Sequence, residues 1–251
     1  MEDLKGKSVL ITGASTGIGA GCAKAFGALG ALVTVHYNAS KDAAMAVARA
    51  VEDTGGQAFV VQGDLRQTAE CERVVNAATD KFGRLDVLIN NAGALVQRVP
   101  ITDISDEVFD DIVNLNVRSM MMCTKYAVPR MTNGGSIINL TSVAARHGGG
   151  PGASLYAGSK GFVSTATKGL AKELVPQRIR VNAVSPGVVV TPFHDKFSTP
   201  QQLESMRATI PMGRLGTVDE CTGAFLYLAS ERLSSYVTGQ IIEINGGQYM
   251  P

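Results

Sequence analysis

Residues Ser8 to Gly19 have the sequence Ser-Val-Leu-Ile-Thr-Gly-Ala-Ser-Thr-Gly-Ile-Gly and pass from an apolar run into a glycine-rich turn. Residues 9–12 are typical of a short buried strand of a parallel sheet, and a helical pattern covers residues 18–29. A turn with Gly13, Gly17 and Gly19 places backbone N–H groups at the positive end of a helix dipole, which suits a dinucleotide pyrophosphate. The spacing is G-x-x-x-G-x-G rather than G-x-G-x-x-G, so an ordinary strand-to-helix turn is the alternative.

Apolar runs and helical patterns alternate along the rest of the chain. Further strands are expected at residues 31–37, 58–61, 86–89, 136–140, 179–184 and 240–244. Helices are expected at residues 41–53, 68–82, about 105–131, 154–174, from Pro200 onward and from Thr217 to Ala229. This alternation predicts an α/β fold, a single-domain Rossmann-type, doubly wound parallel sheet of about seven strands with helices on both faces. No proline- or serine-rich linker divides residues 1–251, so one domain is expected.

The composition excludes several classes of function. The net charge is +1 with no basic block, so neither nucleic acid nor an anionic membrane is an expected partner. Apolar runs are too short to span a bilayer, and the N-terminus lacks a signal-peptide pattern, so a cytoplasmic protein is expected. Cys22, Cys71, Cys123 and Cys221 fall in separate helical patterns and are expected to be free, mostly buried thiols. The three histidines show no metal-ligand spacing, so no metal site is expected.

Tyr156 and Lys160 lie four residues apart on an expected helix and therefore share one face. A lysine ammonium roughly 5 Å from a phenol contributes ~3 kcal/mol at an effective dielectric near 20, which lowers the tyrosine pKa by ~2 units. Such a pair also occurs on ordinary surfaces. Ser142 follows the expected fifth strand, at the same edge of the sheet as the glycine turn, and its hydroxyl would hold a carbonyl oxygen beside the phenol. As a turn residue or a helix cap, Ser142 would have only a structural role.

Several motifs follow the glycine turn in order. They are Asn90-Asn91-Ala92-Gly93, Asn116, Ser142, Tyr156-x-x-x-Lys160, Pro186-Gly187 with Thr191, and Tyr236-Val237-Thr238-Gly239-Gln240 to Gly246-Gly247. Together with Thr12 to Gly19 they resemble the short-chain dehydrogenase/reductase family, and the resemblance covers residues 5–247. It implies an oxidoreductase that moves a hydride between a nicotinamide cofactor and a small carbonyl or alcohol substrate.

The resemblance implies a role for each of four catalytic residues. Tyr156 is the general acid in reduction and the base in oxidation, and Lys160 lowers its pKa and binds the nicotinamide ribose. Ser142 orients and polarises the substrate carbonyl. Asn116 holds a water that links Lys160 to solvent as a proton relay.

The resemblance also implies the cofactor contacts. The glycine turn lines the pyrophosphate, the residues after the third strand lie by the adenine, those after the fourth strand border the adenosine ribose, and those after the sixth strand hold the carboxamide. The implied contacts are Gly13, Ser15, Thr16, Gly17, Ile18, Gly19, Tyr37, Asn38, Ser40, Asp64, Leu65, Asn90, Ala92, Gly93, Tyr156, Lys160, Pro186, Gly187, Val189 and Thr191.

The end of the second strand bears on the choice of nicotinamide. NAD-preferring enzymes of this kind place an acid there to bind the ribose 2′-OH, and this chain has Tyr37 instead. Asn38, Ser40 and Lys41 follow and would meet a 2′-phosphate, although Lys41 is equally explained as a solvated helix-start residue. Thr16 stands where many NADP enzymes of the family carry Arg. We therefore expect NADP, with NAD as the alternative.

The spacing from Ser142 to Tyr156 is one residue longer than in many members of the family. The extra residue falls in residues 147–152, a loop with four glycines that can absorb it. His147 begins this loop, and a solvated loop histidine is favoured over a functional one.

Two readings of the substrate compete: a 3-oxoacyl-carrier-protein reductase, and a dehydrogenase of sugars, polyols or small ketones. The substrate loop, about residues 192–215, mixes apolar and charged side chains and does not decide between them. A non-catalytic nucleotide-binding sensor on the same fold is the alternative outside enzymes. The family is commonly tetrameric, and residues 120–123 and 240–244 are expected to supply apolar surface for a homotetramer.

Overall fold

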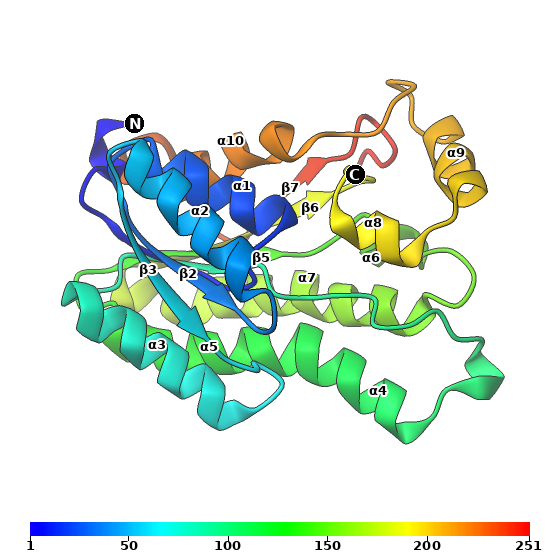
Figure 1. Cartoon of the computed structure of the whole chain (residues 1–251), viewed down its shortest axis with the longest axis horizontal. Coiled ribbons are helices and arrows are strands. Elements are labelled where there is room, and N and C mark those ends of the chain that lie inside the picture. The colour runs from blue at the N-terminus through cyan, green and yellow to red at the C-terminus, as the bar shows by residue number, and fades with distance from the viewer.

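The computed structural model describes residues 1–251 and contains one seven-stranded sheet in the order β3-β2-β1-β4-β5-β6-β7. All neighbouring strands are parallel, and helices flank the sheet (Figure 1). The strands are β1 (Ser8–Ile11), β2 (Leu32–Tyr37), β3 (Gln57–Gln62), β4 (Val87–Asn90), β5 (Gly135–Leu140), β6 (Ile179–Pro186) and β7 (Ile241–Ile244). The predicted Rossmann-type fold is confirmed, and the sixth strand continues two residues beyond its predicted end.

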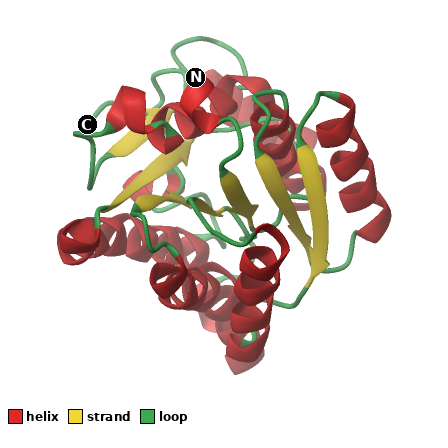
Figure 2. Cartoon of the chain, turned by 90° about the vertical axis from the view of Figure 1, so that its left-hand side faces the viewer, coloured by secondary structure: helices red, strands yellow, loops and turns green.

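The helices form one layer on each face of the sheet (Figure 2). They are α1 (Gly17–Gly27), α2 (Lys41–Asp53), α3 (Thr68–Phe82), α4 (Asp106–Val113), α5 (Ser119–Ala127), α6 (Ala144–His147), α7 (Ser154–Leu174), α8 (Pro192–Phe197), α9 (Pro200–Ala208), α10 (Val218–Ala229) and α11 (Glu231–Ser234). Short 3-10 turns occur at Glu2–Leu4, Ile101–Asp103, Val128–Arg130 and Val175–Gln177. None of these helices has both the length and the apolar character that a bilayer crossing requires.

The sheet separates two hydrophobic cores because successive side chains of a strand point to opposite faces. Val9 and Ile11 of β1 lie in the core under α1, α2 and α10, where Phe26 and Phe225 are fully buried. Leu10, between them, lies in the core under α3, α5 and α7. Both faces of β1 are therefore buried, which explains its continuous apolar run.

Local sequence signals place several helix ends as predicted. Thr199 accepts a hydrogen bond from the Gln202 amide, and the Gln202 side chain accepts one from the Thr199 amide, so the capping box at the start of α9 is confirmed. Glu220 accepts from the Thr217 amide at the start of α10. The four cysteines are free and buried in α1, α3, α5 and α10, as expected.

The predicted helix at residues 105–131 is not uniform. A π-helical turn at Asn114–Arg118 joins α4 to α5, and a 3-10 turn ends the run. Of the residues expected to supply surface for assembly, Met120 and Cys123 are buried inside this chain, whereas Met121 and Met122 between them are partly exposed. The four residues of β7 are all partly exposed, and β7 forms an edge of the sheet.

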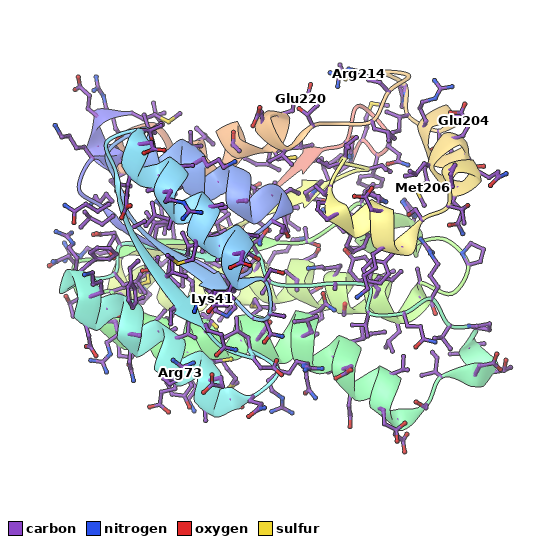
Figure 3. All side chains as sticks on the ribbon, viewed as in Figure 1. Lys41, Arg73, Glu204, Met206, Arg214 and Glu220 are labelled. Atoms are coloured by element: carbon purple, nitrogen blue, oxygen red, sulfur yellow. The ribbon has the colours of Figure 1, made fainter.

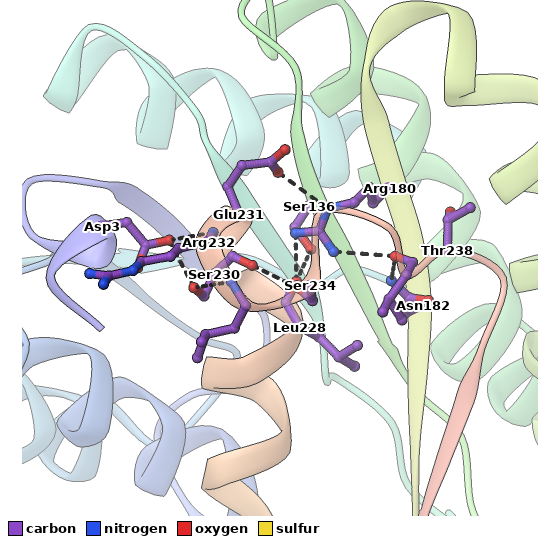
Figure 4. A network of polar contacts seen from close by, with 12 residues as sticks. Asp3, Ser136, Arg180, Asn182, Leu228, Ser230, Glu231, Arg232, Ser234 and Thr238 are labelled. Atoms are coloured by element: carbon purple, nitrogen blue, oxygen red, sulfur yellow. Dashed lines mark hydrogen bonds and ion pairs between the residues drawn. The ribbon is translucent and has the colours of Figure 1, made fainter.

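A polar network at the amino end of β6 connects the sheet to the α10–α11 corner (Figure 4). The Arg180 guanidinium donates to the Leu228 and Val237 carbonyls at 2.8 and 3.3 Å and pairs with Glu231 at 3.4 Å. Ser136 of β5 donates to the same Leu228 carbonyl at 2.8 Å. This network lies at the edge of the sheet opposite the carboxyl ends of the strands.

Candidate active site

The glycine turn between β1 and α1 leaves backbone donors open toward the carboxyl edge of the sheet. Gly13 and Gly17 have φ of +63° and +55°, a conformation that favours glycine. Thr16 is the N-cap of α1 and makes no side-chain cap bond, so the first N–H groups of this 11-residue helix have no side-chain partner. A β-carbon at Gly19 would lie 2.5 Å from the Gly13 carbonyl oxygen. The turn is thus a close-packed backbone cradle that fits the pyrophosphate of a dinucleotide.

Asn90, the last residue of β4, and Asn91, which follows it, point in opposite directions. The Asn91 amide donates to the carbonyls of Thr12 and Gly13 at 2.8 and 2.9 Å and so holds the glycine turn. Asn90 instead donates into the interior, to Asn139 at 2.9 Å and to Thr124 at 3.0 Å. Only the backbone of Asn90 is available to a cofactor, so its predicted contact with the ribose cannot come from its side chain.

Ser142, Tyr156 and Lys160 converge beyond the carboxyl end of β5. Ser142 lies just after β5, and its side chain is close enough to Tyr156, near the start of α7, to lower the pKa of that phenol. Lys160 lies one turn further along α7, with Nζ 5.9 Å from the centre of the Tyr156 ring. Its ammonium donates to the Leu140 carbonyl at 2.8 Å and is almost fully buried. The three side chains predicted from the sequence therefore form one cluster.

Burial governs the protonation of this cluster. Burial raises the pKa of Tyr156 to about 12. The nearby Ser142 side chain lowers that pKa, but by less than burial raises it. Burial lowers the pKa of Lys160 to about 8. The predicted lowering of the Tyr156 pKa by Lys160 is wrong in this structure, because loss of hydration disfavours both the phenolate and the ammonium.

Asn116 lies in the π-helical turn and is 1% exposed. Its side chain donates to the carbonyls of Ala94 and Ile112, both at 2.9 Å, and accepts from the Ala94 amide at 3.2 Å. A β-carbon at Gly93 would lie 2.7 Å from Asn116 Oδ1 and 2.9 Å from Lys160 Nζ. Asn116, Gly93 and Lys160 are therefore neighbours, and the π turn, a feature often found at functional sites, brings Asn116 to them.

The segment after β6 reaches the glycine turn. A β-carbon at Gly17 would lie 3.5 Å from the Thr191 side chain, so Thr191 borders the start of α1. Val189 is buried, and its carbonyl accepts from the Thr191 hydroxyl at 3.3 Å. Pro186 ends β6, and Gly187 packs so closely on Asn245 that a β-carbon there would lie 2.8 Å from the Asn245 Cα.

The residues expected around the adenosine differ in exposure. Tyr37 ends β2 and is only 9% exposed, whereas Asn38 and Ser40 beside it are exposed. Lys41, the first residue of α2, is exposed as well (Figure 3). Ser15 is half-buried and Thr16 exposed at the glycine turn, and Ile18 packs against the first core.

The loop after β3 is held by its own contacts. The Asp64 carboxylate pairs with Arg66 at 2.7 Å, and that guanidinium holds the pKa of Asp64 below its usual value. Leu65 is buried in the second hydrophobic core.

Aromatic side chains and one arginine lie beside Tyr156, in and near the expected substrate loop. The Phe193 ring of α8 lies 5.9 Å from the Tyr156 ring and 5.1 Å from that of Phe197. Arg98 donates to the Phe197 carbonyl at 2.9 Å and to the Pro151 carbonyl at 3.2 Å, which joins α8 to the glycine loop at residues 148–152. The expected substrate loop thus contains α8 and α9. His147 is the last residue of α6 rather than the first of the loop. It is exposed, and its ring accepts from the Gly149 amide at 3.2 Å.

Sequence reasoning missed Asn91, Arg98 and Phe193 as individual site residues. The Asn90-Asn91 pair does carry a signal, because consecutive residues at a strand end face opposite sides of the sheet. The side chain of one of these two asparagines must therefore point into the protein interior. Nothing in the sequence pattern pairs Arg98 with the distant carbonyls of Pro151 and Phe197.

The sequence matches a family model described as enoyl-(acyl carrier protein) reductase over residues 13–248. An uncharacterized oxidoreductase of Methylorubrum extorquens is 40% identical over 98% of this chain and 99% of its own. A 3-oxoacyl-[acyl-carrier-protein] reductase of Staphylococcus aureus is 36% identical over 97% of this chain and 98% of its own.

Solved structures superpose on the whole chain. An NADH-dependent reductase responsible for alginate metabolism shares 38% identity with a TM-score of 0.92 and covers 100% of both chains. The same reductase complexed with NAD gives 36% identity, a TM-score of 0.89, and coverage of 100% of this chain and 99% of its own. A short-chain type dehydrogenase/reductase of Mycobacterium marinum shares 37% identity with a TM-score of 0.92. The match covers 100% of this chain and 98% of that protein's chain.

Proposed function

The chain belongs to the short-chain dehydrogenase/reductase family of NAD(P)-dependent oxidoreductases, and on this basis we propose that it is an NADP-dependent enzyme acting on a ketone or secondary alcohol. The observation that carries the proposal is the convergence of Ser142, Tyr156 and Lys160 beside the glycine turn. A non-catalytic sensor would have no need of this cluster.

The nicotinamide supplies and accepts the hydride, and the chain's own residues handle the proton and the charge. In reduction, the Tyr156 hydroxyl donates its proton to the carbonyl oxygen while Ser142 donates a hydrogen bond to the same oxygen. In oxidation the direction reverses. A Tyr156 pKa raised by burial keeps the phenol protonated at neutral pH, which suits the acid in reduction.

Lys160 and Asn116 support proton transfer. At neutral pH Lys160 is charged, since its pKa is about 8, and its ammonium lies beside Gly93 and Asn116. We assign Lys160 to the ribose of the nicotinamide half and Asn116 to a water-linked path from Lys160 to solvent. The glycine turn would hold the pyrophosphate, and Val189 and Thr191 would hold the carboxamide.

The preference for NADP rests on the end of β2. No carboxylate stands there to repel a 2′-phosphate, and Asn38, Ser40 and Lys41 are exposed beside it. The similar reductase of alginate metabolism is described as NADH-dependent, so NAD is the alternative that a direct comparison of the two cofactors must test.

The substrate class stays open between β-ketoacyl thioesters and sugars or other small carbonyl compounds. The relatives support both, since one is named a 3-oxoacyl-carrier-protein reductase and another acts in alginate metabolism. A panel of β-ketoacyl thioesters, sugars and diketones, each assayed with NADPH and NADH, identifies the class by its kcat/KM.

We also propose that the protein is a cytoplasmic homotetramer. Four free, buried thiols are typical of a reducing compartment. Apolar rings remain exposed on two helices of one face, Phe109 on α4 and Phe162 on α7.

The first test of the catalytic assignment is Tyr156→Phe. Loss of the proton donor is expected to lower kcat by a factor of 100 or more, while the Kd for the cofactor changes little. The matched comparison is Lys160→Ala, which is expected to lose both turnover and cofactor affinity. A Tyr156→Phe enzyme that keeps more than a tenth of the wild-type rate on its best substrate would contradict the assignment.

A further inference from the structure

His36 is a buried imidazole in β2 that the proposed mechanism does not use. It is 2% exposed, and both ring nitrogens have backbone partners. The Gly13 amide donates to Nδ1 at 2.9 Å, and Nε2 lies 3.0 Å from the Gly63 carbonyl oxygen. Because Nδ1 accepts, the proton is on Nε2, which donates to Gly63.

These two partners belong to different cofactor loops. Gly13 opens the glycine turn after β1, and Gly63 opens the loop after β3 that continues into Asp64 and Leu65. Strand β2 lies between β1 and β3, so the imidazole reaches from one neighbouring loop to the other. The backbone of β2 also accepts a hydrogen bond from each loop. The Ala14 amide donates to the His36 carbonyl, and the Gly63 amide donates to the Tyr37 carbonyl.

We propose that His36 is a positioning residue that fixes the distance between the pyrophosphate-binding turn and the adenosine-facing loop. The inference rests on the proposed dinucleotide site and adds to it a residue that touches neither the cofactor nor the substrate. NAD and NADP share the pyrophosphate and the adenine that these two loops would contact. His36 is therefore expected to affect the binding of both cofactors alike.

The neutral form of the ring is required, since a second ring proton would face the Gly13 N–H. Burial lowers the pKa of His36 to about 4, against a smaller opposing effect of its bond to Gly63. Arg73 also favours the neutral form, whereas Asp64 and Glu70 oppose it. The ring is therefore neutral at physiological pH and presents one acceptor and one donor.

Three variants separate the two bonds. His36→Leu removes both, His36→Asn places an amide oxygen where Nδ1 accepts from Gly13, and His36→Gln places an amide nitrogen where Nε2 donates to Gly63. The matched control is Thr34→Val in the same strand, because the Thr34 hydroxyl is buried and makes no hydrogen bond. For each purified protein, calorimetric titration with NADP⁺ and NAD⁺ gives the Kd, and steady-state assays give kcat and KM.

His36→Leu is expected to raise the Kd for both dinucleotides about tenfold, which is the effect of losing one to two hydrogen bonds. The Asn and Gln variants should each recover part of that loss, and kcat at saturating cofactor should stay within about threefold of wild type, because the acid–base residues lie beyond β5. Thr34→Val should keep the wild-type Kd. A residue that only stabilises the fold would lower the melting temperature without changing the Kd of the folded protein.

A folded His36→Leu protein with the wild-type Kd overturns the inference. If that variant does not fold, unchanged Kd values for both the Asn and the Gln variants overturn it. The titration of the wild-type protein is a separate test, since failure to bind either dinucleotide contradicts the proposed function itself, whereas the ratio of variant to wild-type Kd tests His36.

Discussion

Tyr37 ends β2 at the position where an acid would meet the ribose 2′-OH, and it is nine-tenths buried. We predict a lower KM for NADPH than for NADH, and a reversed order in Tyr37→Asp. One charge pair at ~4 Å and an effective dielectric near 20 is worth ~4 kcal/mol before screening, so one carboxylate can set the preference. Steady-state KM values for both cofactors measure it.

Tyr37→Asn is the control, since it has the shape of Asp without the charge and reports the loss of the buried ring alone. Lys41→Ala should weaken NADPH alone if the exposed ammonium meets the 2′-phosphate. Should the unmodified enzyme prefer NADH, the argument from the missing acid is wrong.

Lys160 gives the stability of the chain a dependence on pH. Its pKa is about 8 in the folded chain and 10.5 as an ordinary lysine, so between these values the unfolded chain binds a proton that the folded chain does not. The free energy of unfolding therefore rises with pH, by about 2 kcal/mol between pH 8 and pH 10. Above pH 10 the opposite holds for Tyr156, whose pKa of about 12 in the folded chain makes unfolding release a proton.

Urea denaturation of wild type and Lys160→Met at pH 8 and pH 10 measures this contribution, because all other groups are common to both proteins. The free energy of unfolding of the wild type, relative to that of Lys160→Met, should be higher at pH 10 than at pH 8. Lys168→Met, on an exposed position of the same helix, is the control. A wild-type-minus-variant difference that does not change with pH would show that Lys160 keeps its proton in the folded chain.

Side-chain partners mark the limit of what the sequence could predict at this scale. Spacing placed Tyr156 and Lys160 on one helix face and Ser142 at the same sheet edge, and the structure brings them together. The sign of the Tyr156 pKa shift was missed because burial is a property of the packed site. The bonds of Asn91 and His36 were missed because their partners are backbone groups of other loops.

Among the elements, the β6 and α10–α11 junction depends on one buried cation. Arg180 is 8% exposed and donates to two main-chain carbonyls. Arg180→Met leaves those carbonyls with fewer donors and should lower the free energy of unfolding by about 2–4 kcal/mol. The Kd for cofactor should not change, since Arg180 lies at the amino end of β6. Chemical denaturation and a cofactor titration give the two values.

Glu231→Gln provides the contrast, because the Glu231 side chain is 70% exposed and a surface pair contributes at most about 1 kcal/mol. If the two variants were equally destabilised, the ion pair and not the carbonyl bonds would be the source of the stability.

The strands and most helices were predictable because apolar runs and capping residues are local signals. The junction of α4 and α5 was not, since no local signal in Asn114–Arg118 distinguishes a π turn from an α-helical one. What favours the turn there is long-range: the Asn116 side chain is bonded to Ala94, in a loop that a sequence pattern does not place against it.

For the whole molecule, we predict a tetramer at micromolar concentration, measured by light scattering. Phe162 on α7 is 43% exposed, and burying such rings is the usual reason for closed symmetric assembly. Phe162→Asp should reduce the mass, whereas Tyr236→Asp, at a fully exposed ring outside the helices, should not. A monomeric wild-type protein would contradict the proposal.

The strand order has a consequence for how the chain is made. Every neighbouring pair in the sheet joins consecutive strands except β1 and β4. As the polypeptide leaves the ribosome, β2 and β3 find their partners at once, but the inner edge of β1 stays open until Val87–Asn90 emerges. An open apolar edge is where nascent chains pair with one another. The arrival of β4 therefore closes the open edge of β1, and each later strand in turn covers the edge of the strand before it.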